Sequence, residues 1–351
     1  MTEPNPDVTK PQSLNPLSGP DPSAGRLPRS FVLRGGQNAR DVDLADLAAT
    51  LKEPGDVLWV DIDSSNRSQF ALLEKLFGFH PLAIEDVLNP MSRPKVDQYD
   101  HYLFVTLRVV RFVDETTDPY DLETANLYFF IGTNYLVTVH AGPSHHVEQL
   151  AGICHRTPDV IGRGPARVAH QLMDSAIDAY FPILDRVDEF LDSLEERVFA
   201  SFDEGSLRDI FAVKRLVLSL RRYLAPQREI FNILSNRPSP LLSPELQLYF
   251  RDVYDHMLRI NDSLETYRDL LSSTMESYLS QVSNRLNLVT KGLSVVATLS
   301  VPFVVVSGMW GMNFSRSIPL TDHPWGFEIM LVAQLALGTG LIGLLRWRKW
   351  L

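Results

Sequence analysis

The chain has little cysteine, an acidic balance and almost no charge near its C-terminus. Cys154 is the only cysteine among 351 residues, which excludes a disulfide framework and a cysteine-based zinc site. The chain has 33 lysine and arginine residues against 43 acidic residues, which gives a net charge of -10. A nucleic-acid partner is therefore not expected, whereas the acidic balance is compatible with a protein that binds or transports cations. No P-loop, Gly-x-Ser-x-Gly or His-Glu-x-x-His motif is present, so no enzymatic function is indicated.

Charge is scarcest between residues 292 and 345, where only Arg316, Asp322 and Glu328 are charged. This distribution predicts a membrane segment attached to a soluble body. At the other end, residues 1–30 hold seven prolines and few large apolar groups, which predicts a disordered arm. The arm lacks the basic start and apolar run of a secretory signal, so we expect the following residues to stay in the cytosol.

Residues 31–165 predict a cytosolic α/β or α+β domain. Apolar runs at 57–62, 102–113, 127–131 and 135–139 are typical of strands, and the last two flank the hairpin turn Gly132-Thr133-Asn134. Helical patterns lie at 69–77 and 81–88. The pattern does not fix the order of the strands in the sheet.

Residues 166–291 predict long helices, at about 166–202, 206–235 and from near Pro244 onward. At 100° per residue the first carries seven carboxylates on one face, all within about 60° of Asp174. They are Asp174, Asp178, Asp185, Asp188, Glu189, Asp192 and Glu196. This face is interpreted as a solvated surface, with a cation-attracting surface as the alternative.

The third helix predicts oligomerisation. Between Glu245 and Lys291 there is neither Gly nor Pro, and apolar or small residues recur every three or four positions. If it continues through the uncharged stretch to Met312, it contains about 68 residues and is roughly 100 Å long. Such a stalk, with an apolar seam, implies partner helices.

Two membrane-spanning helices are expected, at 292–312 and 327–345, joined by an external loop at 313–326. Arg285 and Lys291 precede the first span, and the tail at 346–351 holds three basic residues, whereas the loop offers only Arg316. The positive-inside rule therefore predicts that both termini are cytosolic. Two spans cannot enclose a pathway, so conduction would require an oligomer around a central axis.

The first span ends in Trp310-Gly311-Met312-Asn313-Phe314, followed by a short loop, a second span and a basic tail. An aromatic-Gly-Met-Asn motif in this place resembles the CorA family of divalent-cation channels. The resemblance extends to residues 80–89 (HPLAIEDVLN), 93–96 (RPKV) and 249–256 (YFRDVYDH), and it covers nearly everything after the N-terminal arm. It implies a homopentameric Mg²⁺ channel in the cytoplasmic (inner) membrane that is gated by cytosolic Mg²⁺, with Co²⁺ and Ni²⁺ as further candidate ions.

The resemblance makes Gly311, Met312 and Asn313 the selectivity filter. Mg²⁺ releases its bound waters reluctantly. A ring of Asn313 amides can accept hydrogen bonds from these waters without removing them from the ion. The alternative is that Asn313 only caps the helix. The implied pore face comprises Asn287, Thr290, Leu293, Val301, Val304 and Gly308. Leu293 and Val301 would form apolar constrictions, although ordinary helix packing explains the same residues.

The resemblance also implies a regulatory cation site between neighbouring subunits. Asp86 and Glu276 match its two carboxylate positions, with Glu276 in place of the more common Asp, and Asp252 matches a further acidic position. An ion bridging two subunits would stabilise the closed arrangement at high cytosolic Mg²⁺. His140, His145, His146 and His155 near Cys154 offer a competing transition-metal site, but their spacing fits no helix-face pair.

Two further functions remain open from the sequence. A ZntB-type zinc transporter shares the motif, and the loop has Ile318-Pro319-Leu320-Thr321-Asp322 where magnesium members commonly have Met-Pro-Glu-Leu. A membrane-tethered oligomeric scaffold is the less favoured alternative, and it predicts no ion flux.

Overall fold

The computed structural model describes residues 29–34, 37–40, 44–53, 55–65, 75–89, 92–113, 120–157, 159–200, 204–312 and 323–350. The predicted arm at 1–28, most of the predicted helix at 69–77, Asn313 and most of the external loop lie outside these residues. The chain forms two compact units. One comprises Met1–Glu189 with Ala212–Arg268, and the other comprises Phe190–Phe211 with Asp269–Leu351.

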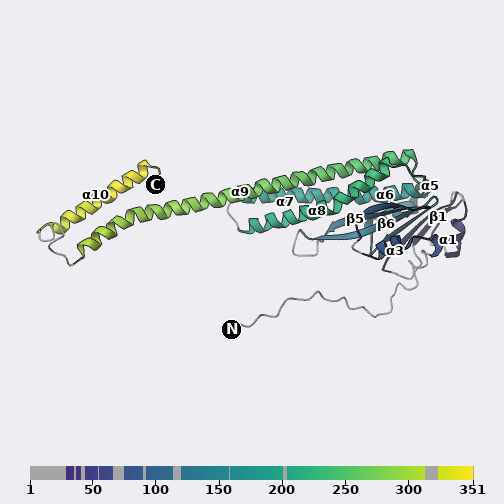
Figure 1. Cartoon of the computed structure of the whole chain (residues 1–351), viewed down its shortest axis with the longest axis horizontal. Helices are drawn as coiled ribbons and strands as arrows, with labels where there is room; N and C mark the ends of the chain where they lie inside the picture. The colour runs from purple at the N-terminus through teal and green to yellow at the C-terminus, as the bar shows by residue number, and fades with distance from the viewer. Residues whose placement is uncertain are drawn as a thin grey trace, which may run out of the picture. The chain divides into compact units, whose positions relative to one another are not determined.

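The first unit contains a seven-stranded mixed sheet (Figure 1). Its strands are β1 (Arg29–Arg34), β2 (Gln37–Arg40), β3 (Val57–Asp63), β4 (Lys95–Gln98), β5 (Leu103–Phe112), β6 (Leu122–Ile131) and β7 (Tyr135–His140). The order is β2-β1-β3-β7-β6-β5-β4, and β3 pairs with β7 in parallel while the other pairs are antiparallel. The predicted β6–β7 hairpin is confirmed, with Ile131 opposite Leu136. Sequence patterns missed β1, β2 and β4, which are short and carry polar residues.

Both faces of the sheet are covered because its strands are apolar on both sides. On one face α1 (Leu44–Thr50) and α3 (Pro81–Leu88) contribute Leu47, Ala83 and Val87 to a core shared with Val60 and Phe130. The other face carries α4 (His145–Arg156), α5 (Asp159–Gly162) and α6 (Pro165–Asp178), and α6 contacts four strands. The α/β domain predicted from the sequence is therefore confirmed.

The long helices are α7 (Tyr180–Ala200), α8 (Glu204–Asn236), α9 (Pro244–Trp310) and α10 (Gly326–Trp347). The prediction of one helix over 166–202 is wrong, because α6 and α7 are separate and meet at Ala179. Pro182 explains the break: it has no N–H for the carbonyl of Asp178, and its ring crowds that carbonyl. A proline is tolerated in the first turn of α7, where no such bond is needed.

Buried side chains attach the helices to the edge of the sheet. β4 pairs with β5 only as far as Thr106, so the outer edge of β5 at Arg108 has no neighbouring strand among the described residues. The Arg108 N–H donates to Gln227 Oε1 at 3.1 Å, and Tyr180 Oη donates to the Arg108 carbonyl at 2.6 Å. Gln227 Nε2 also donates to Tyr180 Oη, so α7 and α8 satisfy the edge through one connected network.

A buried ion pair lies where the parallel strands β3 and β7 end. His140 Nε2 lies 3.2 Å from Asp61, and Thr138 Oγ1 donates to Asp61 Oδ1 at 2.7 Å. Burial lowers the pKa of His140, but the hydrogen bond and charge of Asp61 outweigh it, so the pKa is raised above the ordinary value of 6.5. Protonated His140 therefore stabilises the fold below pH 6.5, and this contribution is lost as pH rises through the folded-state pKa.

We predict that Asp61→Asn flattens the dependence of stability on pH. In the parent protein the unfolding temperature should fall as the pH rises through the raised pKa of His140, because the paired cation is lost there. The measurement is thermal unfolding of the detergent-solubilised protein across pH 5.5 to 8.5, about the range in which histidine titrates. The exposed His101→Gln variant is the control and should follow the parent curve. Parallel curves for the parent and Asp61→Asn would contradict this account.

Candidate functional site

The C-terminal part of α9 and the whole of α10 are long and apolar enough to cross a membrane. Only 6% of the most apolar stretch of α9 and 11% of that of α10 is buried within the chain. A core helix of a soluble protein would be mostly buried, so these exposed surfaces need lipid or further protein to cover them. α9 ends at Trp310 and α10 extends from Gly326 to Trp347, two residues beyond the predicted end.

The six residues predicted for the pore face are all exposed on α9: Asn287, Thr290, Leu293, Val301, Val304 and Gly308. Leu293 and Val304 are each 69% exposed, although they are apolar. A set of less exposed residues in the same segment recurs every three or four positions: Val295, Leu299, Phe303, Val306 and Trp310. At 100° per residue the second set lies on the opposite side of the helix. α10 runs alongside this end of α9 (Figure 1).

Gly311 and Met312, the first two residues of the predicted filter, form a turn directly after α9. The Gly311 N–H donates to the Ser307 carbonyl at 3.1 Å, and the Met312 N–H donates to the Met309 carbonyl at 3.3 Å. These two residues are thus hydrogen-bonded to the last helical turn. The third filter residue, Asn313, lies outside the described residues, and its role stays a prediction.

Asp86 is already paired within the chain. It lies near the end of α3, and Lys95 Nζ contacts its carboxylate at 2.6 Å and that of Asp97 at 2.7 Å. Burial lowers the pKa of Lys95, but the hydrogen bonds to Asp86 and Asp97 outweigh it and raise the pKa. A cation that binds Asp86 must therefore compete with a firmly protonated ammonium group.

The other two predicted regulatory residues are exposed on α9. Glu276, in the second unit, has no ion-pair partner in the described part of the chain. Asp252, in the first unit, lies one helical turn before His256, with 3.9 Å between its Oδ2 and His256 Nε2. Asp86 belongs to the first unit and Glu276 to the second, and their pairing across neighbouring subunits stays a prediction.

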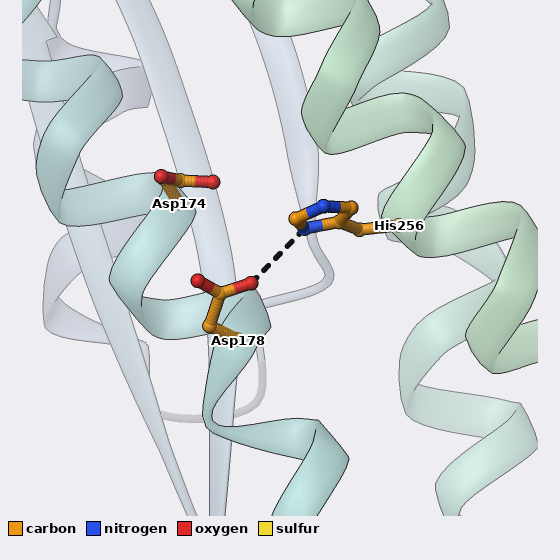
Figure 2. A group of neighbouring side chains, drawn as sticks. All are labelled: Asp174, Asp178 and His256. Atoms are coloured by element: carbon orange, nitrogen blue, oxygen red, sulfur yellow. Dashed lines mark hydrogen bonds and ion pairs between the residues drawn. The ribbon is translucent and has the colours of Figure 1, made fainter.

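The structure instead brings together Asp174, Asp178 and His256 (Figure 2). Asp174 and Asp178 lie one turn apart on α6, and His256 reaches them from α9, with Nδ1 3.0 Å from Asp178 Oδ1. Within this three-residue cluster, the candidate ligand atoms all lie within 4.8 Å of one another. Burial, followed by the charge of Asp178, raises the pKa of Asp174. A bound cation would relieve the repulsion between these carboxylates.

Sequence reasoning placed both aspartates on the acidic face but did not connect them with His256. The sequence did contain two i, i+4 pairs of potential metal ligands on predicted helices, Asp174-x₃-Asp178 and Asp252-x₃-His256. Residues at this spacing lie on the same face of a helix, so either pair could have indicated a metal site. Two carboxylates suit Mg²⁺ that keeps several waters, and the imidazole adds affinity for Co²⁺, Ni²⁺ or Zn²⁺. The cluster therefore has the donor set of a divalent-cation site.

The competing histidine site does not assemble among the described residues. His140 pairs with Asp61, His146 Nδ1 lies 3.1 Å from Ser175 Oγ, and the ring of His155 lies 5.3 Å from that of Phe31. Cys154 is buried, and burial raises the pKa of its thiol to about 11, which disfavours a metal-binding thiolate. His140, His146 and His155 are therefore each engaged in separate contacts within the fold.

Comparison with known proteins gives three consistent findings. The model of the CorA-like Mg²⁺ transporter protein family matches residues 54–347. The cobalt/magnesium transport protein CorA of Thermotoga maritima is 30% identical over 295 residues, which are 84% of this chain and 83% of that protein. The complete structure of the CorA magnesium transporter from Methanocaldococcus jannaschii has a TM-score of 0.79 at 21% identity and covers 93% of this chain and 99% of that one.

The ZntB cytoplasmic domain from Vibrio parahaemolyticus is also similar, with a TM-score of 0.58 at 16% identity, covering 73% of this chain and 98% of that domain. At these identities the two solved structures show a shared fold alone. The predicted architecture, with an N-terminal α/β domain, long helices and two C-terminal apolar helices, is confirmed.

We predict that the three-residue cluster binds Co²⁺, used here as a spectroscopic probe. Asp178→Asn and His256→Gln should each weaken binding about tenfold or more, because each removes a ligand. Titration of the solubilised protein, followed by visible absorption and calorimetry, measures this. Asp188→Asn, an exposed carboxylate on α7, is the matched control and should bind as the parent does. Equal Co²⁺ affinity in all four proteins would exclude the cluster as a site.

Proposed function

Because the chain belongs to the CorA-like Mg²⁺ transporter family, we propose that it mediates uptake of Mg²⁺ across the cytoplasmic membrane as a channel. The observation that carries this proposal is the exposed, uncharged face of α9 that leads to the Gly-Met-Asn motif. The 30% identical relative is named for cobalt and magnesium transport, which supports Co²⁺ as a second permeant ion. Ni²⁺, which has the same charge and a similar hydrated size, is included in the proposal.

The proposed pathway runs along the axis of a homo-oligomer, and we take the number of subunits, five, from the resemblance. Each α9 would turn its exposed face, with Leu293, Val301 and Val304, toward the axis, and α10 would cover the opposite side. Leu293 and Val301 then form apolar rings that close by excluding water, and Asn287 a polar ring at the cytosolic mouth. Lipid covers the remaining apolar surface, and both termini are cytosolic.

Ion selection is proposed to occur at Asn313. A neutral amide oxygen accepts a hydrogen bond from water bound to the ion, and several such oxygens around an axis recognise a hydrated divalent cation. A ring of carboxylates would hold the ion more strongly and slow its release. Gly311 leaves room for the backbone beside the ion because it has no side chain.

A zinc transporter of the ZntB type is the second candidate. The external loop supports it, because its sequence departs from the Met-Pro-Glu-Leu run of magnesium members. Magnesium transport is preferred because the relative with 30% identity covers most of the chain, whereas the likeness to the ZntB domain extends to the fold alone.

Regulation by cytosolic Mg²⁺ is proposed to act through acidic residues of the cytosolic part. One candidate site pairs Asp86 with Glu276 of a neighbouring subunit, with Asp252 near it. The other is the three-residue cluster of Asp174, Asp178 and His256. An ion bound in either site stabilises the arrangement that holds the carboxylates together, and we assign that arrangement to the closed channel.

The filter proposal predicts that Asn313→Ala reduces Mg²⁺ uptake to background. Loss of the amide oxygens removes the groups that recognise the hydrated ion, whereas membrane insertion and assembly depend on other residues. Uptake is measured in cells or vesicles, together with the elution volume of the solubilised oligomer. Asn236→Ala, at the end of α8, is the control and should keep parental uptake. Parental uptake by an assembled Asn313→Ala protein would refute the filter assignment.

The regulatory proposal predicts opposite effects from the two partners of one ion pair. Asp86→Asn with Glu276→Gln should weaken the protection that Mg²⁺ gives against proteolysis and let flux persist at Mg²⁺ levels that silence the parent. Lys95→Met should have the reverse effect, because it frees the Asp86 carboxylate from its present partner. Proteolysis at graded Mg²⁺ concentrations measures both.

The same titration separates the two candidate sites. If His256→Gln weakens protection and the Asp86/Glu276 pair does not, the three-residue cluster is the sensor and the assignment of Asp86 and Glu276 is wrong. Unchanged protection in every variant would refute both sites.

A further inference from the structure

Two polar residues on the apolar helices have no place in the pathway described above. Ser307 is on α9 and Gln334 is on α10, within segments that otherwise suit hydrocarbon. A polar side chain in that environment is costly unless it is hydrogen-bonded. The structure pairs the two: Gln334 Nε2 donates to Ser307 Oγ at 3.0 Å.

A close backbone approach lies one helical turn away. The ring of Phe303 packs over Gly338, and a Cβ atom added at Gly338 would lie 2.7 Å from Phe303 Cζ. Any side chain at position 338 would force the Phe303 ring to shift, and small residues of this kind are common where membrane helices pack closely. Farther along, Lys291 Nζ donates to the carbonyl of Lys349 at 3.0 Å, just after α10 ends.

These three contacts define a single antiparallel register. Between the contact at Lys291 and the contact at Phe303, α9 advances by 12 residues. Between the partners of these two contacts, Lys349 and Gly338, the chain steps back by 11 residues, a nearly equal number. From Phe303 to Ser307 and from Gly338 to Gln334 both steps are four residues. Slippage of α10 by one residue would turn Gln334 about 100° away from Ser307 and place a side chain against Phe303.

The contact at Ser307 lies in the last turn of α9, directly before the filter motif in the sequence. The Ser307 carbonyl accepts the hydrogen bond from the Gly311 N–H at 3.1 Å, so Gln334, Ser307 and Gly311 form one chain of contacts. Thr339 shows the ordinary alternative for a hydroxyl on these helices, since its Oγ1 donates to the Leu335 carbonyl of its own helix at 2.9 Å. Ser307 instead accepts a bond from the neighbouring helix.

We propose that Gln334 is a positioning residue for ion selection, which fixes the axial position and rotation of the last turn of α9 and of the adjoining Gly311 and Met312 through Ser307. This inference rests on the proposed function, because it assigns a role in the selectivity of the same pathway. It makes α10 a support for the filter in addition to a membrane anchor. The register contacts at Gly338 and Lys349 keep Gln334 opposite its acceptor.

The test uses isosteric pairs in the full-length protein reconstituted in liposomes. Gln334→Met removes the donor at similar size, and Ser307→Val removes the acceptor, whereas Ser307→Thr keeps the hydroxyl in the same shape as valine. Thr339→Val is the control on α10, because it removes a hydroxyl that bonds only within its helix among the described residues. The readouts are the ratio of Mg²⁺ to Ni²⁺ flux and the unfolding temperature of the assembled oligomer.

We expect the flux ratio to fall about three- to tenfold in Gln334→Met and in Ser307→Val, the range for loss of one interhelical hydrogen bond. The double variant should fall no further than either single variant, because both changes break the same contact. Ser307→Thr and Thr339→Val should keep the parental ratio. If Gln334→Met does not assemble, the Ser307→Val and Ser307→Thr pair tests the same contact.

An unchanged flux ratio with a lowered unfolding temperature would overturn the inference, because the bond would then only stabilise the protein. Additive losses in the double variant would also overturn it, because the residues would then act separately. A parent protein that carries no Mg²⁺ would refute the proposed function itself. A conducting parent with unaffected variants would refute only the role of Gln334.

Discussion

The uncharged end of α9 has two sides, and one chain can cover only one of them. α10 packs against the side that carries Phe303, while Leu293, Val301 and Val304 stay exposed on the other side. Exposure of such an apolar surface to water is unfavourable, so the surface must pack against lipid or against other copies of the same helix. The proposed oligomer, its axis and its ion pathway all depend on this constraint, because a pathway needs a face that is both continuous and left open by the subunit's own second helix.

Divalent cations impose different chemistry at the two ends of such a protein. In a filter, binding must be weak enough for release, which favours neutral oxygens that contact the ion through its waters. In a sensor, binding must change the stability of one state, which favours charged ligands. The residues follow this division: the Gly-Met-Asn motif, proposed as the filter, holds an amide and no carboxylate, whereas the three-residue cluster of Asp174, Asp178 and His256 holds two carboxylates and an imidazole. Lys95 adds a competitor at Asp86, so occupancy there requires the cation to displace an ammonium group.

The parts of the fold that were predictable from the sequence are long or strongly patterned. α9, α10 and the β6–β7 hairpin follow from an uninterrupted apolar seam, an uncharged run and a turn between two apolar runs. The edge strands β2 and β4 were missed because each is only four residues long and mostly polar, so neither shows a clear apolar pattern. The meeting of Asp178 with His256 joins residues 78 positions apart, and the bond from Gln334 to Ser307 depends on helix register. Neither is encoded in local periodicity.

The most direct test of the central claim is ion flux into liposomes that contain only the purified protein, with Mg²⁺, Co²⁺, Ni²⁺ and Zn²⁺ compared under the same gradient. A channel of the proposed kind should carry Mg²⁺ down its gradient, with Co²⁺ and Ni²⁺ also entering. Flux restricted to Zn²⁺ would contradict the magnesium assignment in favour of zinc transport. The absence of flux for all four ions, in protein shown to be inserted and oligomeric, would contradict the account as a whole.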